Sequence, residues 1–118
     1  MENHRLVLPG DLNHYGFLFG GRLLQWIDET SWIAASLDHP GSKFVTIGLD
    51  KVEFHHPVRQ GTILAIRCEK IRQGNTSVTY SIEVYDQRQQ DTPIFSTNST
   101  FVAVDDSGTK VAIATQPL

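Results

Sequence analysis

The segment that begins at Asn13 brings together residue types that could activate or attack a carbonyl group. A pair of glycines, Gly20 and Gly21, directly precedes a stretch of helix-forming residues that contains Asp28. Glycines at the N-terminus of a helix let a ligand approach bare backbone N–H groups, and the helix dipole favours negative charge there. Such donors would stabilise a carbonyl oxygen that acquires negative charge. Asp28, about two turns further along, could act as a general base toward water or as a nucleophile.

Asn13 could assist the same chemistry, because its amide offers a donor to the carbonyl and an acceptor to a water molecule. Two simpler interpretations remain open from the residues alone. An isolated asparagine is commonly a turn residue that bonds to its own backbone. A glycine pair can also serve the close packing of a helix on a sheet. The placement of Asn13 before Phe19 and Gly20-Gly21 favours the catalytic interpretation.

The residues from Gly21 to about Leu37 favour a helix, which Pro40-Gly41 ends. At about 100° per residue, the polar residues form one narrow stripe, and Asp28 projects roughly a right angle away from it, toward an apolar face. A carboxylate beside an apolar face loses hydration and needs a partner or a chemical purpose. Asp28 is therefore a candidate for catalysis, and a structural carboxylate that caps a neighbouring loop is the alternative. The stripe consists of Arg22, Gln25, Glu29 and Ser36.

Outside this helix, the chain has the two-residue period of β-strands. The connections between these strands are short, which indicates antiparallel pairing, because parallel strands require long crossovers. One helix on one antiparallel sheet is the simplest arrangement of these elements, and it gives an α+β fold. The expected strands are Leu6 to Leu8, Phe44 to Phe54, Thr62 to Ile71, Val78 to Val84 and Ile94 to Val104.

Composition and charge exclude several classes of function. The chain has 118 residues, of which 40% are hydrophobic and 19% are charged, as in an ordinary globular domain. A net charge of −3 provides no broad basic surface for nucleic acid. No apolar stretch approaches the ~20 residues that span a membrane. The single cysteine, Cys68, cannot form an internal disulfide, which favours a reducing cytoplasm and a packing role for this residue.

Metal and cofactor chemistry is not expected. His55 and His56 are adjacent, so they point to opposite faces of an extended segment. Neither histidine belongs to a His-x-x-x-His or His/Asp cluster. The sequence also lacks the Gly-x-Ser-x-Gly motif of serine hydrolases.

The motif Asp-Leu-Asn-x-x-Gly-x-x-Phe-Gly-Gly of residues 11–21, followed by Asp28-Glu29 in an apolar helix, resembles the signature of the hotdog acyl-CoA thioesterases. In particular, it is similar to that of the bacterial YciA-like enzymes and the cytosolic acyl-CoA hydrolases. The resemblance covers nearly the whole chain, in order. Its further segments are Phe44-Val45-Thr46, residues 52–58, residues 72–77 and residues 100–105.

This resemblance implies a hotdog fold over residues 1–118, in which an antiparallel sheet of about five strands wraps one long central helix. It implies hydrolysis of acyl-CoA to free CoA and a carboxylic acid, without a cofactor. By analogy, Asn13 and Asp28 form the catalytic pair, donated by opposite subunits of a homodimer, and the N–H groups of Gly20 and Gly21 polarise the thioester carbonyl. Such dimers often assemble further into a trimer of dimers.

The analogy leaves three points open. Asp28 could activate water or attack the carbonyl itself to form an anhydride. Trp32, one helical turn after Asp28, and His14-Tyr15 are bulkier than the family pattern, and Trp32 would either narrow the acyl tunnel or pack in the core. A non-catalytic acyl-CoA-binding module is the alternative function, and a hydratase or dehydratase is a third.

The residues assigned to CoA contacts by analogy are Arg72, Gly74, Thr76 and Ser77, with Arg59 as a further candidate for phosphate.

Overall fold

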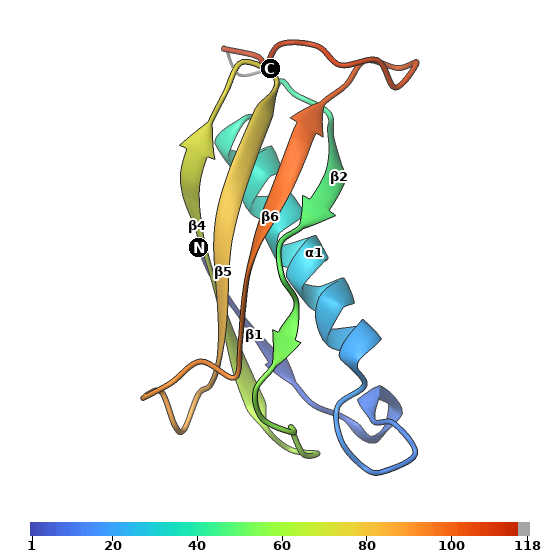
Figure 1. Cartoon of the computed structure of the whole chain (residues 1–118), viewed down its shortest axis with the longest axis vertical. Helices are drawn as coiled ribbons and strands as arrows, with labels where there is room; N and C mark the ends of the chain where they lie inside the picture. Colours follow the sequence, from blue (N-terminus) through green and yellow to red (C-terminus); the bar gives the residue numbers. More distant parts are fainter. Residues whose placement is uncertain (116–118) are drawn as a thin grey trace.

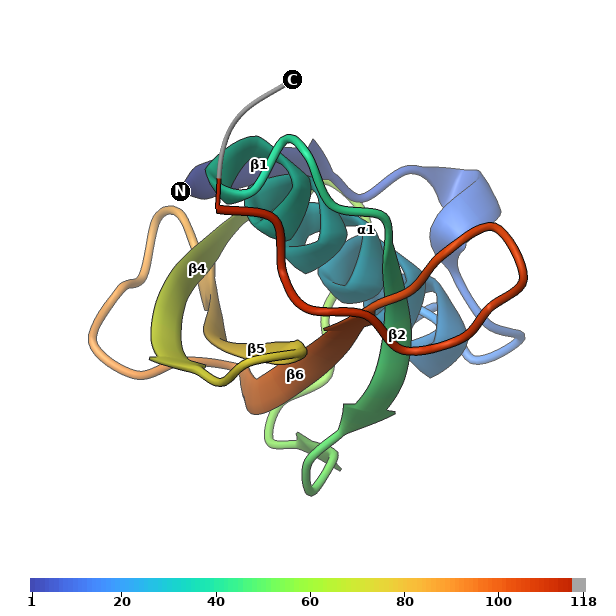
Figure 2. The ribbon, with the colours of Figure 1, turned by 90° about the horizontal axis from the view of Figure 1, so that it is seen from above.

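One long helix lies across the concave face of an antiparallel sheet, and the sheet curves around it (Figures 1 and 2). The computed structural model describes residues 1–115, so residues 116–118 of the expected domain lie outside the described range. The sheet has the strand order β1-β4-β5-β6-β2, and β3 pairs with β6 as well. In chain order the elements are β1 (Glu2–Leu6), the 3-10 turn η1 (Pro9–Asp11), α1 (Gly20–Asp38), β2 (Phe44–Leu49), β3 (Glu53–Phe54), β4 (Ile63–Gln73), β5 (Ser77–Asp86) and β6 (Phe95–Ala103).

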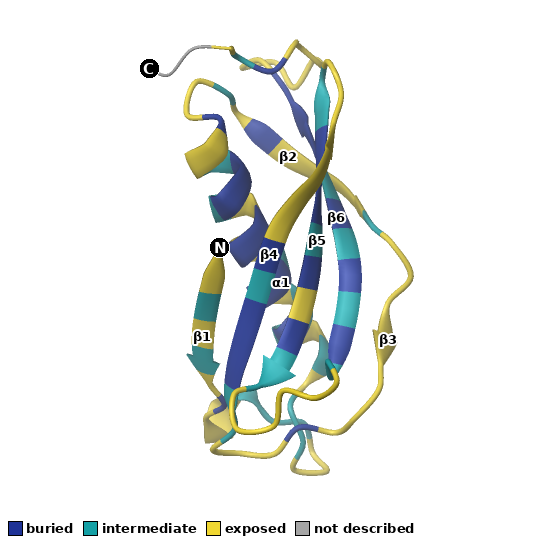
Figure 3. Ribbon diagram, turned by 90° about the vertical axis from the view of Figure 1, so that its left-hand side faces the viewer, coloured by how far each residue is buried: buried dark blue, intermediate teal, exposed yellow. Residues whose placement is uncertain are grey.

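The helix α1 forms where the sequence predicted it, because its apolar residues recur on one face. Figure 3 shows this buried face turned toward the sheet. Gln25 and Glu29, on the predicted polar stripe, are exposed. The helix ends at Asp38, and the N–H of His39 bonds to the carbonyl of Ala35 in its last turn. The buried residues of the helix are Leu23, Trp26, Ile27, Thr30, Ser31, Ala34 and Ala35.

The concave face of the sheet supplies the other half of the core. In β5, Val78, Tyr80, Ile82 and Val84 are each at most 1% exposed, as the alternation of the sequence predicted. Cys68 of β4 belongs to the same core and is 3% exposed, so this thiol packs among apolar side chains. Burial of one large apolar side chain contributes about 1.5–3 kcal/mol to stability. Many such contacts fix α1 on the sheet.

Two edge segments differ from their predicted bounds. The N-terminal strand is Glu2–Leu6 rather than Leu6 to Leu8, because it pairs with residues 63–67 of β4. The expected strand from Phe44 to Phe54 divides into β2 and the two-residue β3, with the polar residues Asp50-Lys51 between them. Both parts pair with β6, so the division adds a sixth, very short strand without changing the layers of the fold.

Candidate active site

The loop that leads into α1 is held in place by backbone hydrogen bonds. The N–H of Phe19 donates to the carbonyl of Asp11 at 2.9 Å, which closes the loop on itself. The N–H of Leu18 donates to the carbonyl of Val58 at 2.7 Å, which ties the loop to the segment between β3 and β4. Asn13, inside this loop, therefore has a fixed position beside the first turn of α1.

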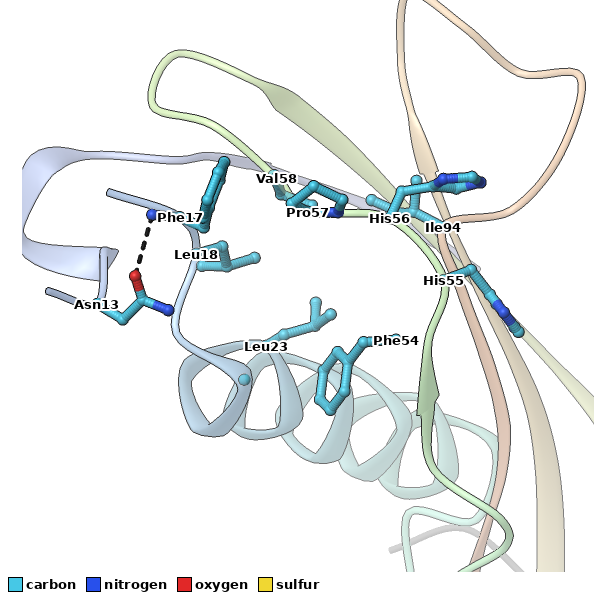
Figure 4. A pocket seen from close by; sticks show the side chains of 11 residues that line it. Asn13, Phe17, Leu18, Leu23, Phe54, His55, His56, Pro57, Val58 and Ile94 are labelled. Carbon is cyan, nitrogen blue, oxygen red and sulfur yellow. Dashed lines mark hydrogen bonds between the residues drawn. The ribbon is translucent and has the colours of Figure 1, made fainter. Parts of the chain in front are cut away.

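The side chain of Asn13 has one end in the loop and one end free. Its Oδ1 accepts hydrogen bonds from the N–H groups of Tyr15 at 2.9 Å and Phe17 at 3.1 Å. Gly16 allows this turn because its φ of 87° lies in the left-handed region. Since both bonds need an oxygen acceptor, the amide nitrogen faces the other way, toward the start of α1 (Figure 4). Asn13 therefore has the turn role of the simpler interpretation. Its amide nitrogen has no acceptor among residues 1–115, so it remains available as a donor.

The two glycines leave the first N–H groups of α1 unobstructed. The N-cap residue Phe19 makes no side-chain cap hydrogen bond, and no acceptor within residues 1–115 receives the N–H of Gly20 or Gly21. A Cβ at Gly20 would lie 3.0 Å from the ring of Phe54, and one at Gly21 would lie 3.0 Å from the ring of Phe19. The glycine pair therefore serves close packing and donor exposure together.

A cavity of about 300 Å³ opens beside Asn13 and Gly20. In Figure 4 the side chains of Leu23 and Phe54 lie on the α1 side of this cavity, and those of Pro57 and Val58 lie across from them. The rings of His55 and His56 point away from its centre in the same view. The lining residues are Asn13, Phe17, Leu18, Gly20, Leu23, Phe54, His55, His56, Pro57, Val58 and Ile94.

Asp28 lies on α1 outside the lining of this cavity. The residue is half-buried, and its Oδ1 accepts a solvent-exposed hydrogen bond of 2.6 Å from the hydroxyl of Thr46 on β2. This partner is on a strand rather than a loop, so the expected alternative of a loop-capping carboxylate is not what the structure shows. Asp28 does not line the cavity that Asn13 borders. One chain alone therefore does not bring the two predicted catalytic side chains into one cavity.

Thr46 is a hydrogen-bond partner of Asp28 that the sequence did not indicate by itself. The resemblance of Phe44-Val45-Thr46 to the family pattern is the one sequence feature that could have indicated Thr46. Its contact with Asp28 joins residues on two different elements, and local periodicity carries no information on such a contact.

The predicted CoA-binding residues fall into two separate groups. Arg59 precedes β4, and its guanidinium lies over the ring of Phe17 at 5.0 Å, close to the loop that holds Asn13. The others lie in the β4–β5 hairpin, at the opposite end of the molecule (Figure 1). The structure does not bring Arg59 to this hairpin within one chain. The guanidinium of Arg72 donates to the hydroxyl of Thr79 at 3.3 Å. The hairpin residues are Arg72, Gly74, Thr76 and Ser77.

Other residues noted in the sequence have surface positions. Trp32 is 43% exposed and its Nε1 donates to the carbonyl of Phe44 at 3.1 Å, so the expectation that it could pack in the core is wrong. His14 is exposed, and its ring packs at a tilt against that of Tyr15, with centroids 3.9 Å apart. Within residues 1–115, no three His, Cys, Asp or Glu side chains lie close enough to hold a metal ion. In the same range, no helix is both long enough and apolar enough to cross a membrane.

The family of the chain follows from its similarity to known proteins. The family model of the thioesterase superfamily matches residues 15–92. The chain belongs to this superfamily. The acyl-CoA thioester hydrolase YciA of Escherichia coli is 32% identical over 109 residues, which cover 87% of this chain and 82% of YciA. Mouse acyl-coenzyme A thioesterase 11 is 36% identical over 84 residues, which cover 71% of this chain but only 14% of that longer protein.

Solved structures of this superfamily have the same architecture. A hexameric thioesterase from Yersinia pestis is 30% identical, with a TM-score of 0.85 over 97% of this chain and 94% of its own. The acyl-CoA hydrolase of Staphylococcus aureus, solved with butyryl-CoA and CoA, is 30% identical, with a TM-score of 0.83 over 96% of this chain and 70% of its own. The fold is therefore the hotdog fold, as the sequence predicted.

Proposed function

We propose that this protein hydrolyses acyl-CoA thioesters in a site that two copies of the chain share. The observation that supports the proposal best is the arrangement at the start of α1. Asn13 and Gly20 border one cavity, and their N–H donors have no acceptor among the described residues. Preorganised donors of this kind stabilise the oxyanion that forms when a thioester carbonyl is attacked.

The reaction needs a nucleophile on the carbonyl carbon and an exit for the thiolate. In the general-base route, Asp28 takes a proton from water while the water oxygen bonds to the carbonyl carbon. The N–H groups of Gly20 and Gly21 and the amide of Asn13 stabilise the charge on the carbonyl oxygen. Collapse of the intermediate breaks the carbon–sulfur bond and releases CoA, which takes up the proton, and a carboxylic acid. In the second route, the carboxylate of Asp28 attacks the carbonyl carbon, and the carbon–sulfur bond breaks as the CoA thiolate leaves. Water then hydrolyses the resulting anhydride, which restores the carboxylate of Asp28 and releases the acid.

A second copy of the chain would complete the site. β2 is an edge strand, and its Val45 and Ile47 are 43% and 56% exposed. Pairing of β2 with the β2 of another copy around a two-fold axis would cover this edge. The same pairing would place Asp28, held by Thr46 of β2, at the interface, where Asn13 of the other copy could approach it. The hexameric relative from Yersinia pestis is consistent with such dimers assembled as a trimer.

The hydrolase of Staphylococcus aureus supports the choice of these two side chains. It has been solved as alanine variants of one asparagine and one aspartate, and the asparagine variant contains coenzyme A. That asparagine and aspartate have the same spacing in their chain as Asn13 and Asp28 have here. We infer that Asn13 and Asp28 occupy the corresponding positions.

The two groups of CoA-contact candidates fit a shared site as well. Arg59 lies at one end of the molecule and the hairpin with Arg72, Gly74, Thr76 and Ser77 at the other. The CoA portion would therefore contact both groups only where one copy supplies the hairpin and another supplies Arg59. Guanidinium groups are well suited to the phosphates of CoA.

The proposal is tested by the release of CoA thiol from a panel of acyl-CoA substrates. Asp28→Asn should lower kcat by about 10²–10⁴-fold, because it removes the general base or nucleophile. Glu29→Gln is the matched control, since Glu29 is the next residue, is exposed and, among residues 1–115, pairs with Arg5 alone. The control should keep nearly the wild-type rate. CoA binding without hydrolysis by the wild-type protein would favour the non-catalytic binding module instead.

A further inference from the structure

The cavity beside Gly20 is suited to an apolar group of limited length. Apart from Asn13 and two histidines whose rings point outward, its lining side chains are hydrocarbon. Its volume of about 300 Å³ lies at the lower end of the range of small-molecule cavities, which is roughly 300–1,000 Å³. The thioester carbonyl and sulfur would occupy part of this space, and a short hydrocarbon chain would fill the rest.

Phe54 lines this cavity directly beside Gly20. Its Cζ lies 3.0 Å from the position that a Cβ on Gly20 would take, so the ring rests directly on the backbone of the oxyanion donor. On its other side the ring contacts Phe95, which is fully buried, with centroids 5.2 Å apart. Phe95 therefore limits how far the ring of Phe54 can retreat, although Phe54 itself is 51% exposed.

We propose that Phe54 is a specificity-determining residue that restricts the substrate to acyl-CoA with short, apolar acyl groups. This inference rests on the proposed function, because it assumes that the carbonyl binds at Gly20. The ring closes the cavity next to the reacting carbon, so an acyl group longer than the cavity would have to displace it. Removal of the ring extends the cavity toward Phe95 and admits longer chains.

The test is a series of saturated acyl-CoA substrates from two to sixteen carbons, with kcat/KM measured for each. The wild-type protein should act best on short chains and lose activity as the chain outgrows the cavity. Phe54→Ala should move the optimum upward by about two carbons or more, with a gain of up to about fourfold for each methylene that finds new contact. Val52→Ala is the control, since Val52 is an exposed apolar residue of the same segment that does not line the cavity. It should leave the profile unchanged.

A second measurement separates this inference from the proposed function. Non-hydrolysable alkyl-CoA thioethers of the same lengths report chain-length preference by calorimetry, whether or not the protein has hydrolase activity. A wild-type affinity that peaks at short chains and moves to longer ones in Phe54→Ala supports the inference, even if no hydrolysis occurs. Phe54→Leu replaces Phe54→Ala if the alanine variant does not fold. Equal profiles for the wild type and a folded Phe54 variant, in hydrolysis or in thioether binding, would overturn it.

Discussion

At the scale of single residues, Asn13 combines a structural and a proposed chemical task in one amide group. Its oxygen accepts the N–H groups of Tyr15 and Phe17, which fixes the loop. The same two bonds orient its nitrogen toward the cavity, where it can donate to a carbonyl oxygen. These two bonds use both acceptor positions of the oxygen. Asn13 is therefore better suited to donate to a carbonyl oxygen than to accept a hydrogen bond from water, the second role that the sequence suggested.

Asn13→Asp separates the two tasks. A carboxylate keeps an oxygen for Tyr15 and Phe17 but replaces the N–H donor with negative charge, so kcat/KM should fall by about 10²-fold or more. The melting temperature should change little, because the loop bonds persist. Asn13→Ala loses both functions and should also lower the melting temperature by several degrees, at about 1 kcal/mol for each lost hydrogen bond. An Asn13→Asp protein with more than half of the wild-type rate would rule out the donor role.

Thr46 is expected to act as a positioning residue, since its hydroxyl holds the carboxylate of Asp28. Thr46→Val has nearly the same shape but no hydroxyl, and it should lower kcat by roughly tenfold with little change in KM. Thr46→Ser keeps the donor and should restore most of the rate. If the serine and valine variants were equally impaired, packing of the threonine methyl group would be the better explanation.

At the scale of elements, features that depend on contacts between residues close in sequence were predicted better than those that depend on contacts between distant residues. The helix α1 and the buried alternation of β5 depend on local periodicity, and both were predicted closely. The bounds of β1 and the division between β2 and β3 depend on pairing with distant strands, which the local pattern does not contain. The site shows the same contrast. The motif indicated Asn13 and the glycine pair, but the contacts of Thr46 with Asp28 and of Phe54 with Gly20 were not predictable from it.

The C-terminal end of α1 contains a group whose ionisation should affect stability. His39 is 9% exposed. Burial lowers its pKa below the ordinary 6.5, Lys70 on β4 lowers it further, and Asp38 partly opposes both. The unfolded chain therefore binds a proton more readily than the folded one. The contribution of neutral His39 to the free energy of unfolding is complete above pH 6.5. It is lost as the pH falls from 6.5 through the folded-state pKa.

The free energy of unfolding, measured with denaturant between pH 7.5 and 5, should decrease with falling pH in the wild type. His39→Gln removes the titrating group and should flatten part of that decrease, whatever its effect on stability at pH 7.5. An unchanged slope in the glutamine variant would show that other groups cause the pH dependence.

At the scale of the whole molecule, the isolated chain has an incomplete site and an uncovered edge. Asn13 and Gly20 border the cavity, whereas Asp28 lies beside β2, whose outer edge exposes Val45 and Ile47. One assembly around β2 would account for both features. We therefore propose that catalysis depends on Asn13 and Asp28 from two different copies of the chain.

Mixing two inactive variants tests this claim most directly. Asn13→Ala and Asp28→Ala proteins should each lack activity, and reversible dissociation followed by reassociation should give statistical heterodimers. Each heterodimer would contain one intact site of two, so the mixture should recover up to roughly one quarter of the wild-type rate. Differently tagged chains would allow the heterodimers to be isolated and counted. No recovered activity in confirmed heterodimers would mean that both residues act within one chain or that neither is catalytic.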